Sequence, residues 1–236
     1  MSELTPVGYR DGDTDLSGWV AKPESKAKGL VIVFPTIANV NPPIERRARM
    51  LAAEGYLAFI ADFYGEPVDS FEAAGALGQK LRSSVDGYRG RLRAAVSAAK
   101  GLPGAAGLDA AAIGYCLGGG AALEIARDGA DLKAVVSFHG LLATGRAAEP
   151  GKVKARILVC HGDADPMVPR KHVIAFWEEM DGAGADWHFH SYSGVRHGFT
   201  DPGSDERDFD AVAYDASADR QSWAAMLSFL DEAIAG

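Results

Sequence analysis

Five short apolar runs, each about as long as a β-strand, constrain the fold of this chain most strongly. They are almost continuously apolar, and β-branched residues are frequent in them. Strands buried on both faces of a parallel sheet have this pattern, whereas strands with one solvated face alternate apolar and polar residues. The runs are LVIVF (30–34), LAFIADF (57–63), AAIGY (111–115), AVVSF (134–138) and RILVC (156–160).

Segments with helical periodicity lie between and after these runs. The clearest is the last one, in which Trp223, Met226, Leu230 and Ile234 share one face. Alternating strands and helices predict an open α/β sheet, mostly parallel, with helices on both faces and right-handed crossovers. We expect helices at 43–55, 88–101, 119–129, 170–182 and 219–234, and outer strands at 18–23 and 186–192.

The chain is long enough for one sizeable core, and we interpret residues 1–236 as a single domain. No repeat or low-complexity linker divides it, and no long insertion after residue 138 would form a large cap. The 24 basic and 32 acidic residues give a net charge of −8, which disfavours nucleic acid and anionic membranes as partners. A monomer and a homodimer are both open.

The same composition indicates a cytoplasmic protein. Its two cysteines are too few for a disulfide framework. The N-terminus lacks the basic start and apolar stretch of a signal peptide. No apolar run approaches the ~20 residues that a membrane span needs.

One cysteine occupies an unusual place, in the stretch GYCLGGG (114–120). An apolar run ends at Cys116 and an expected helix begins just after it, so Gly114 to Gly118 fit a G-x-nucleophile-x-G elbow with sulfur in place of oxygen. Such an elbow strains the nucleophile's backbone and needs small neighbours. The free amides and positive dipole end of the helix favour a thiolate and later an oxyanion, with the Leu117 amide as first donor. The alternative is a buried structural cysteine.

A nucleophilic thiol needs a base, and the base needs an orienting group. Elbow enzymes order these residues as nucleophile, acid and histidine along the chain. The stretch CHGDADPMVPRKH (160–172) supplies Asp163 and Asp165, and SGVRHGF (193–199) supplies His197 in a glycine-marked loop. The order therefore favours His197 as the base, with either aspartate as its partner.

The other histidines and the remaining acids give weaker signals. We expect structural roles for His188 and His190, a solvated His172, and pocket positions for His161 or His139 at strand ends. The chain has no H-E-x-x-H motif and no paired cysteine spacing. We therefore expect neither a metal nor another cofactor.

The stretches FPTIANVN, ADFYG, GYCLGGG, HGDADPMVP and RHGF, in this order, resemble the dienelactone hydrolase family of the α/β-hydrolase fold. The resemblance runs from about residue 8 to residue 233, and GYCLGG is its most specific part. It implies a carboxymethylenebutenolidase-like ester hydrolase with its nucleophile at Cys116 and its histidine at His197. The family's D-x-x-V-P pattern selects Asp165 as the acid, and its second oxyanion donor falls on the amide of Ile37.

Two positions depart from the family's pattern. The namesake enzymes carry a glutamate that helps to prepare the thiol where this chain has Thr36, and a substrate-binding arginine where it has Asp201. Because an aspartate repels anions, we expect a small neutral substrate rather than the dienelactone. The expected substrate-binding residues are Thr36, Tyr64, His139 and Phe199.

The residues therefore predict hydrolysis of a small ester or lactone by Cys116, His197 and Asp165 through a thioester. A side activity on activated phosphotriesters would use the same groups. Two alternatives stay open at this stage. The fold could serve as a non-catalytic ligand-binding or regulatory module with a decayed site, or Cys116 could be a redox thiol resolved by Cys160.

Overall fold

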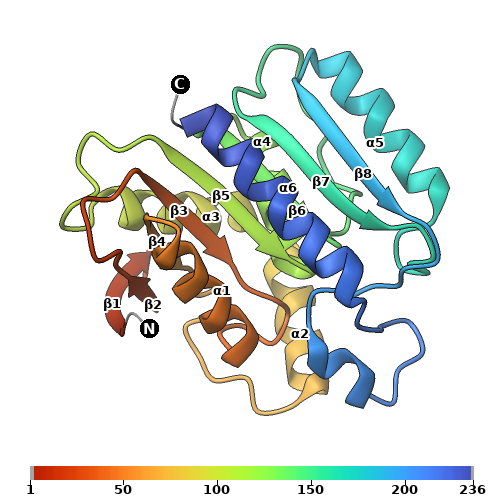
Figure 1. Cartoon of the computed structure of the whole chain (residues 1–236), viewed down its shortest axis with the longest axis horizontal. Helices are drawn as coiled ribbons and strands as arrows, with labels where there is room; N and C mark the ends of the chain where they lie inside the picture. Colours follow the sequence, from red (N-terminus) through yellow and green to blue (C-terminus); the bar gives the residue numbers. More distant parts are fainter. Residues whose placement is uncertain (1–2, 235–236) are drawn as a thin grey trace.

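The computed structural model describes residues 3–234. Within this range eight strands form one sheet in the order β1-β2-β4-β3-β5-β6-β7-β8 (Figure 1). The strands are β1 (Leu4–Asp11), β2 (Thr14–Ala21), β3 (Gly29–Phe34), β4 (Tyr56–Ile60), β5 (Ala110–Tyr115), β6 (Ala134–Phe138), β7 (Arg156–Gly162) and β8 (Trp187–Tyr192).

The sheet is mostly parallel, as the apolar runs predict. All pairs from β4 across to β8 are parallel, whereas β1 pairs with β2 and β2 with β4 in antiparallel register. The five apolar runs form β3 to β7, and β3 to β6 are buried along their whole length. The mixed α/β fold is thus confirmed.

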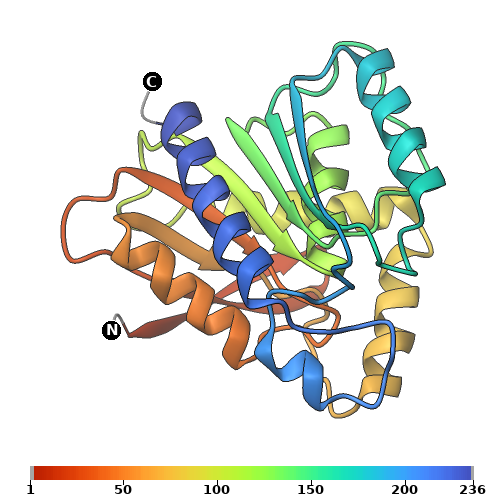
Figure 2. The same ribbon diagram turned by 45° about the vertical axis from the view of Figure 1, so that its right-hand side comes forward.

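Helices cover both faces of the sheet (Figures 1 and 2). Helices α1 (Pro42–Ala53) and α6 (Ala216–Ile234) pack on one face, while α3 (Val85–Lys100), α4 (Leu117–Arg127) and α5 (Arg170–Ala183) pack on the other. Helix α2 (Phe71–Arg82) contacts α3, and a short 3₁₀ helix η1 (Pro202–Glu206) precedes α6. No helix among residues 3–234 has the length and apolar character to cross a membrane.

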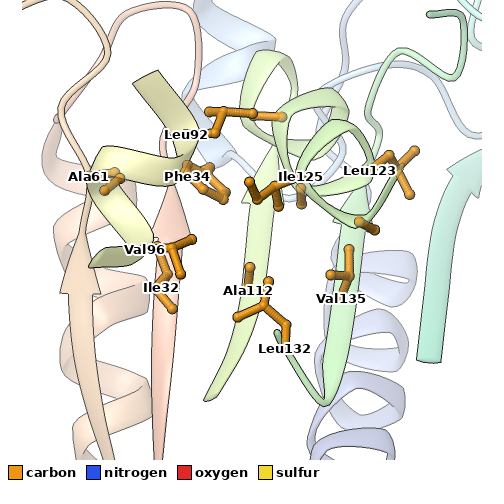
Figure 3. Close-up of a cluster of buried hydrophobic side chains, with 14 of the residues drawn as sticks. Ile32, Phe34, Ala61, Leu92, Val96, Ala112, Leu123, Ile125, Leu132 and Val135 are labelled. Atoms are coloured by element: carbon orange, nitrogen blue, oxygen red, sulfur yellow. The ribbon is translucent and has the colours of Figure 1, made fainter. Parts of the chain in front are cut away.

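Alternation along β3 places the core on both sides of the sheet. Ile32 faces the layer of Val96 in α3 and Ile125 in α4 (Figure 3), while the adjacent Val33 belongs to the cluster that holds Leu230 of α6. Because both faces are covered, the side chains of these strands are removed from water. A ligand can therefore reach the sheet only at the edge where the strands end.

One strand and one α-helix lie outside the sequence expectations, namely β1 and α2, as does the short η1. Strand β1 contains a proline and a glycine, residues that are depleted in strands, and it lies at the edge of the sheet. Helix α2 buries only Ala74 and Gly78, so it lacks a stripe of large apolar residues.

Candidate active site

Cys116 lies between β5 and α4 in a strained backbone conformation. Its φ of 56° and ψ of −117° fall outside the regions that non-glycine residues normally adopt. Such strain persists only where the surroundings enforce it, and it is concentrated at functional sites. Asn39, Cys116 and His139 are the non-glycine residues with positive φ in the described range, and all three follow parallel strands of the sheet.

Close contacts explain the glycines around this cysteine. A Cβ on Gly114 would lie 1.9 Å from the carbonyl oxygen of Gly118, and one on Gly118 would lie 2.1 Å from that of Phe34. Both neighbours are backbone atoms of packed elements, which cannot move aside. The glycines thus allow α4 to pack directly behind the strand that carries the cysteine.

Asp165 and His197 form a buried hydrogen-bonded pair. Nδ1–H of His197 donates to Oδ2 of Asp165 over 2.7 Å, and Oδ1 of the same carboxylate accepts from the Met167 amide over 2.8 Å. The His197 loop is itself held by backbone bonds to Ala211 and Ala213. The carboxylate therefore fixes both the orientation and the tautomer of the imidazole.

The environment of Cys116 and His197 favours an ion pair. Burial raises the pKa of the Cys116 thiol, but attraction to His197 and bonds from the amides of Leu117 and Ile37 outweigh it, so that this pKa lies below its ordinary value. Burial lowers the pKa of His197, but Cys116 and Asp165 outweigh it and raise that pKa above its ordinary value. His197 Nε2 is buried, and no group other than the thiol of Cys116 bonds to it within residues 3–234, so this nitrogen is the one that can exchange a proton.

A turn after β3 orients the Ile37 amide. The amide of Asn39 donates to the carbonyl of Thr36 over 2.9 Å. That carbonyl and the N–H of Ile37 belong to one planar trans peptide and point in opposite directions. Since the carbonyl is held inside the turn, the N–H points outward toward the sulfur of Cys116, beside the Leu117 amide at the start of α4.

The buried carboxylate of Asp62 holds this turn in place. Its Oδ1 accepts from the side-chain amide of Asn39 over 2.8 Å and from the backbone amide of Tyr64 over 2.9 Å. The hydroxyl of Tyr64 in turn donates to the carbonyl of Ile37 over 3.1 Å. The loops after β3 and β4 are therefore locked together behind the two donor amides.

A second buried chain of polar groups reaches Cys116 from α1 and α6. Arg47 forms an ion pair with Asp219 and donates to the Thr200 carbonyl over 2.9 Å. The Thr200 hydroxyl lies 2.9 Å from Nε2 of His139, whose Nδ1 accepts from the backbone amide of Cys116 over 3.1 Å. Because Nδ1 accepts, Nε2 carries the proton and donates to the hydroxyl. Burial and the neighbouring cations lower the pKa of His139 well below its usual value, so this imidazole is neutral.

A cavity of about 630 Å³ opens over these groups, with Cys116 and His197 in its lining. The size is that of a small-ligand pocket. The wall also includes Thr36 and Ile37 from the loop after β3, and His139 after β6. An electrophile in the cavity can thus meet the sulfur, a proton carrier and two aligned amides together.

Comparisons with known proteins identify the family of this chain. The model of the dienelactone hydrolase family matches residues 16–234. The chain belongs to the dienelactone hydrolase family. It is a hydrolase with a mixed α/β fold, and its sequence resemblance to this family is confirmed.

Three proteins are similar to this chain over different shares of its length. A solved dienelactone hydrolase-like promiscuous phosphotriesterase from metagenomic libraries is 34% identical with a TM-score of 0.94, covering 98% of both chains. An uncharacterized protein of Caenorhabditis elegans is 41% identical over 61% of this chain and 93% of its own length. A carboxymethylenebutenolidase of Pseudomonas sp. (strain P51) is 31% identical over 59% of this chain and 61% of its own.

The expected substrate-binding residues of this hydrolase separate into two groups. Thr36 and His139 line the cavity. Tyr64 and Phe199 lie in the hydrophobic core instead, Tyr64 as a support of the Ile37 turn and Phe199 packed 5.2 Å from the His139 ring. The hydroxyl of Thr36 accepts from the side-chain amide of Asn41 over 3.1 Å.

The two aspartates that sequence order leaves open occupy different environments. Asp165 contacts His197, whereas Asp163 forms an ion pair with Arg170. His161 is buried, with no partner for either ring nitrogen among the described residues. Between residues 3 and 234, no three histidine, cysteine or acidic side chains come close enough together to hold a metal ion.

Several cavity residues are absent from the sequence-based expectations. Phe71 and Phe209 are large apolar residues in otherwise polar stretches, a signal that could have marked them. Arg47 gives no such signal, because its burial depends on the partner in α6.

Proposed function

We propose that this chain hydrolyses small ester or lactone substrates with Cys116 as nucleophile, His197 as general base and acid, and Asp165 as the group that orients His197. One observation carries the proposal. The strained Cys116 lines the same cavity as His197, whose Nδ1–H is held by Asp165 at 2.7 Å. The lowered pKa of Cys116 and the raised pKa of His197 favour the thiolate over the neutral thiol and support Cys116 as the nucleophile.

In the acylation step, Sγ of Cys116 attacks the carbonyl carbon and a C–S bond forms. The carbonyl oxygen becomes an oxyanion, which accepts hydrogen bonds from the amides of Leu117 and Ile37. When the intermediate collapses, the C–O bond to the alcohol breaks and the imidazolium of His197 gives its proton to the leaving oxygen. A thioester remains, and in a lactone the alcohol stays attached to the acyl chain.

In the deacylation step, neutral His197 takes a proton from water as the water oxygen attacks the thioester carbonyl. The same two amides hold the second oxyanion. The C–S bond then breaks, the acid leaves, and the thiolate of Cys116 again faces the imidazolium. The carboxylate of Asp165 stabilises the positive ring.

We propose a side activity on activated phosphotriesters at the same site. The solved relative with 34% identity over 98% of both chains is described as a promiscuous phosphotriesterase. A phosphoryl oxygen carries partial negative charge and can accept the same two amide bonds as a carbonyl oxygen. Attack by Sγ would displace the most acidic alcohol and leave a phosphorylated cysteine for water to cleave.

The experiment measures hydrolysis of p-nitrophenyl acetate, of an uncharged γ-lactone and of a p-nitrophenyl phosphotriester by wild type, Cys116→Ala and Cys160→Ala. Cys160 is fully buried and burial raises its pKa, so its replacement serves as the matched control. We expect Cys116→Ala to lose carboxylic ester turnover and Cys160→Ala to keep it. Equal background rates for wild type and Cys116→Ala would refute the catalytic proposal and favour a non-catalytic module, and equal rates above background would refute Cys116 as the nucleophile.

A redox function predicts a different outcome. Mild peroxide would then link Cys116 to Cys160, and intact-mass measurement would show the loss of two hydrogens. The burial of Cys160 does not favour it as a resolving thiol. We expect oxidation to stay on Cys116, without a disulfide.

A further inference from the structure

Exposed large apolar side chains gather at the mouth of the catalytic cavity. Within residues 3–234 the large hydrophobic residues with high exposure are Phe71, Met167, Ile174, Trp177 and Phe209. Phe71, Met167 and Phe209 line the cavity, although they come from three distant parts of the chain. Exposed apolar groups that converge on a concave site mark a surface that binds apolar ligands.

Phe71 and Phe209 form a pair across this mouth. Their ring centroids lie 6.2 Å apart with the planes tilted by 52°, and the two residues are 71% and 45% exposed. Phe71 is the first residue of α2, which Ser70 caps, and Phe209 follows η1. Figures 1 and 2 both show the start of α2 beside the segment that contains η1. The pair therefore offers two ring faces to a group that enters the cavity.

The charges at the same mouth are mainly negative. Asp69 and Asp208 line the cavity, and neither forms an ion pair within the described range. Of the lining arginines, Arg207 is paired with Asp201, and Arg47 is paired with Asp219. No unpaired cation among the described lining residues is thus available to hold a substrate carboxylate, and two free carboxylates oppose one.

We propose that Phe71 and Phe209 bind an aryl or similarly bulky apolar part of the substrate, while Asp69 and Asp208 exclude anionic substrates. The substrate class is then an uncharged or cationic ester with an aryl-sized apolar group. This inference rests on the proposed function, because it assigns the substrate of the same site. It makes the two phenylalanines and two aspartates the specificity-determining residues.

A set of acetates tests the proposal, since the acyl group is the same in all of them. Phenyl acetate and 3-tert-butylphenyl acetate are neutral, 3-(trimethylammonio)phenyl acetate is the cationic isostere of the latter, and 3-carboxyphenyl acetate is anionic. Vinyl acetate lacks the ring. For each we would measure kcat/KM by pH-stat and divide it by the hydroxide-catalysed rate constant, which removes differences in intrinsic reactivity.

The aromatic part of the proposal predicts the behaviour of the Phe71→Ala/Phe209→Ala variant. Losing two ring contacts lowers kcat/KM about tenfold for the neutral aryl acetates, with vinyl acetate within about threefold of wild type. The matched control is Ile174→Ala/Trp177→Ala, which removes two other exposed large apolar groups, outside the cavity lining. The control should change no rate. An unchanged ratio of aryl to vinyl rates in the phenylalanine variant would overturn the aromatic assignment.

The charge part of the proposal predicts that wild type prefers the cationic ester to the anionic one. In the Asp69→Asn/Asp208→Asn variant, the ratio of kcat/KM for the cationic ester to kcat/KM for the anionic ester should fall about fivefold at low ionic strength, because two nearby carboxylates are removed. If wild type hydrolysed the anionic ester with the same corrected kcat/KM as the neutral aryl esters, this assignment would be overturned. If wild type hydrolysed none of these acetates, or if Cys116→Ala hydrolysed them at wild-type rates, the proposed function itself would instead be refuted. Melting temperatures of all variants, expected near wild type for exposed positions, exclude misfolding as the cause.

Discussion

Asp165→Asn tests the link between the buried carboxylate and the imidazole. In the native site each carboxylate oxygen has one donor, the Met167 amide at 2.8 Å and Nδ1–H of His197 at 2.7 Å. Asparagine keeps the shape of the side chain but has one oxygen. That oxygen has to stay with the Met167 amide, because turning the side chain would set its NH₂ against an N–H donor.

The NH₂ of the new side chain then faces Nδ1 of His197. Nδ1 must accept this bond, so the ring proton moves to Nε2, the nitrogen that should take protons in the reaction. We expect kcat to fall by about 10³–10⁴-fold, which corresponds to about 4–5.5 kcal/mol of activation free energy. The pKa of the Cys116 thiol should also rise, since the imidazolium that lowers it is no longer stabilised.

The assay is steady-state hydrolysis of p-nitrophenyl acetate, with the melting temperature measured on the same samples. Asp163→Asn is the matched control, because Asp163 lies two residues away and pairs with Arg170. That control should stay within about threefold of wild type, the range expected for removal of a peripheral ion pair. A folded Asp165→Asn enzyme with kcat within about threefold of wild type would refute the tautomer argument. Loss of activity in the Asp163 variant alone would show that the wrong acid was assigned.

Three further predictions concern the pH profile, the elbow and its support. The pKa of Cys116 lies below its ordinary value of 9.0, so kcat/KM should fall with acid at a pH below 9, where the thiolate is protonated. The pKa of His197 is raised to about 10, so kcat/KM should fall with alkali near pH 10, where the imidazolium loses its proton; an acid limb at pH 9 or above would contradict this. Gly118→Ala would place a Cβ 2.1 Å from the Phe34 carbonyl oxygen, so the free energy of unfolding measured in urea should fall by about 1–3 kcal/mol. An unchanged free energy of unfolding would contradict the close contact. His139→Leu should lower kcat about tenfold, because the hydrogen bond from the Cys116 amide is lost. His139→Asn should recover part of the lost kcat, because asparagine tolerates the positive φ of 39° and keeps an acceptor. Equal rates in both variants would argue against a role of His139 in positioning Cys116.

The sequence predicted those parts of the fold that depend on local pattern. The apolar runs become β3 to β7, and the periodic segments become α1, α3, α4, α5 and α6, with ends displaced by a few residues. The sequence pattern did not predict strand β1 and helix α2, because their apolar content is low and their position depends on neighbouring elements. Helix α2 packs mainly on α3, and its small buried residues leave no periodic signal.

In the candidate site, too, the residues in local motifs could be predicted and those that depend on tertiary packing could not. The G-x-C-x-G spacing and the family's motifs point to Cys116, Asp165, His197 and the two donor amides, and the structure brings these groups to one edge of the sheet. The cavity wall is harder to predict from sequence. Tyr64 and Phe199 follow strands, as pocket residues often do, but their side chains turn into the core.

The residues missed at the cavity mouth depend on tertiary structure. Phe71 and Phe209 are 138 positions apart, and nothing in the local sequence of either indicates the other. They meet because the His197 loop is paired through backbone bonds with residues 211 and 213, which places the preceding segment beside α2. The periodicity of a sequence does not predict such contacts between distant segments.

Rapid acid quenching of the enzyme with p-nitrophenyl acetate, followed by intact-mass measurement and peptide mapping, tests most directly whether Cys116 is the nucleophile. We expect one acetyl group per chain during the first turnover, on the peptide that contains Cys116 and not on the one that contains Cys160. A burst of p-nitrophenol with the acetyl group on another residue, or with no acetyl group on the chain, would contradict it.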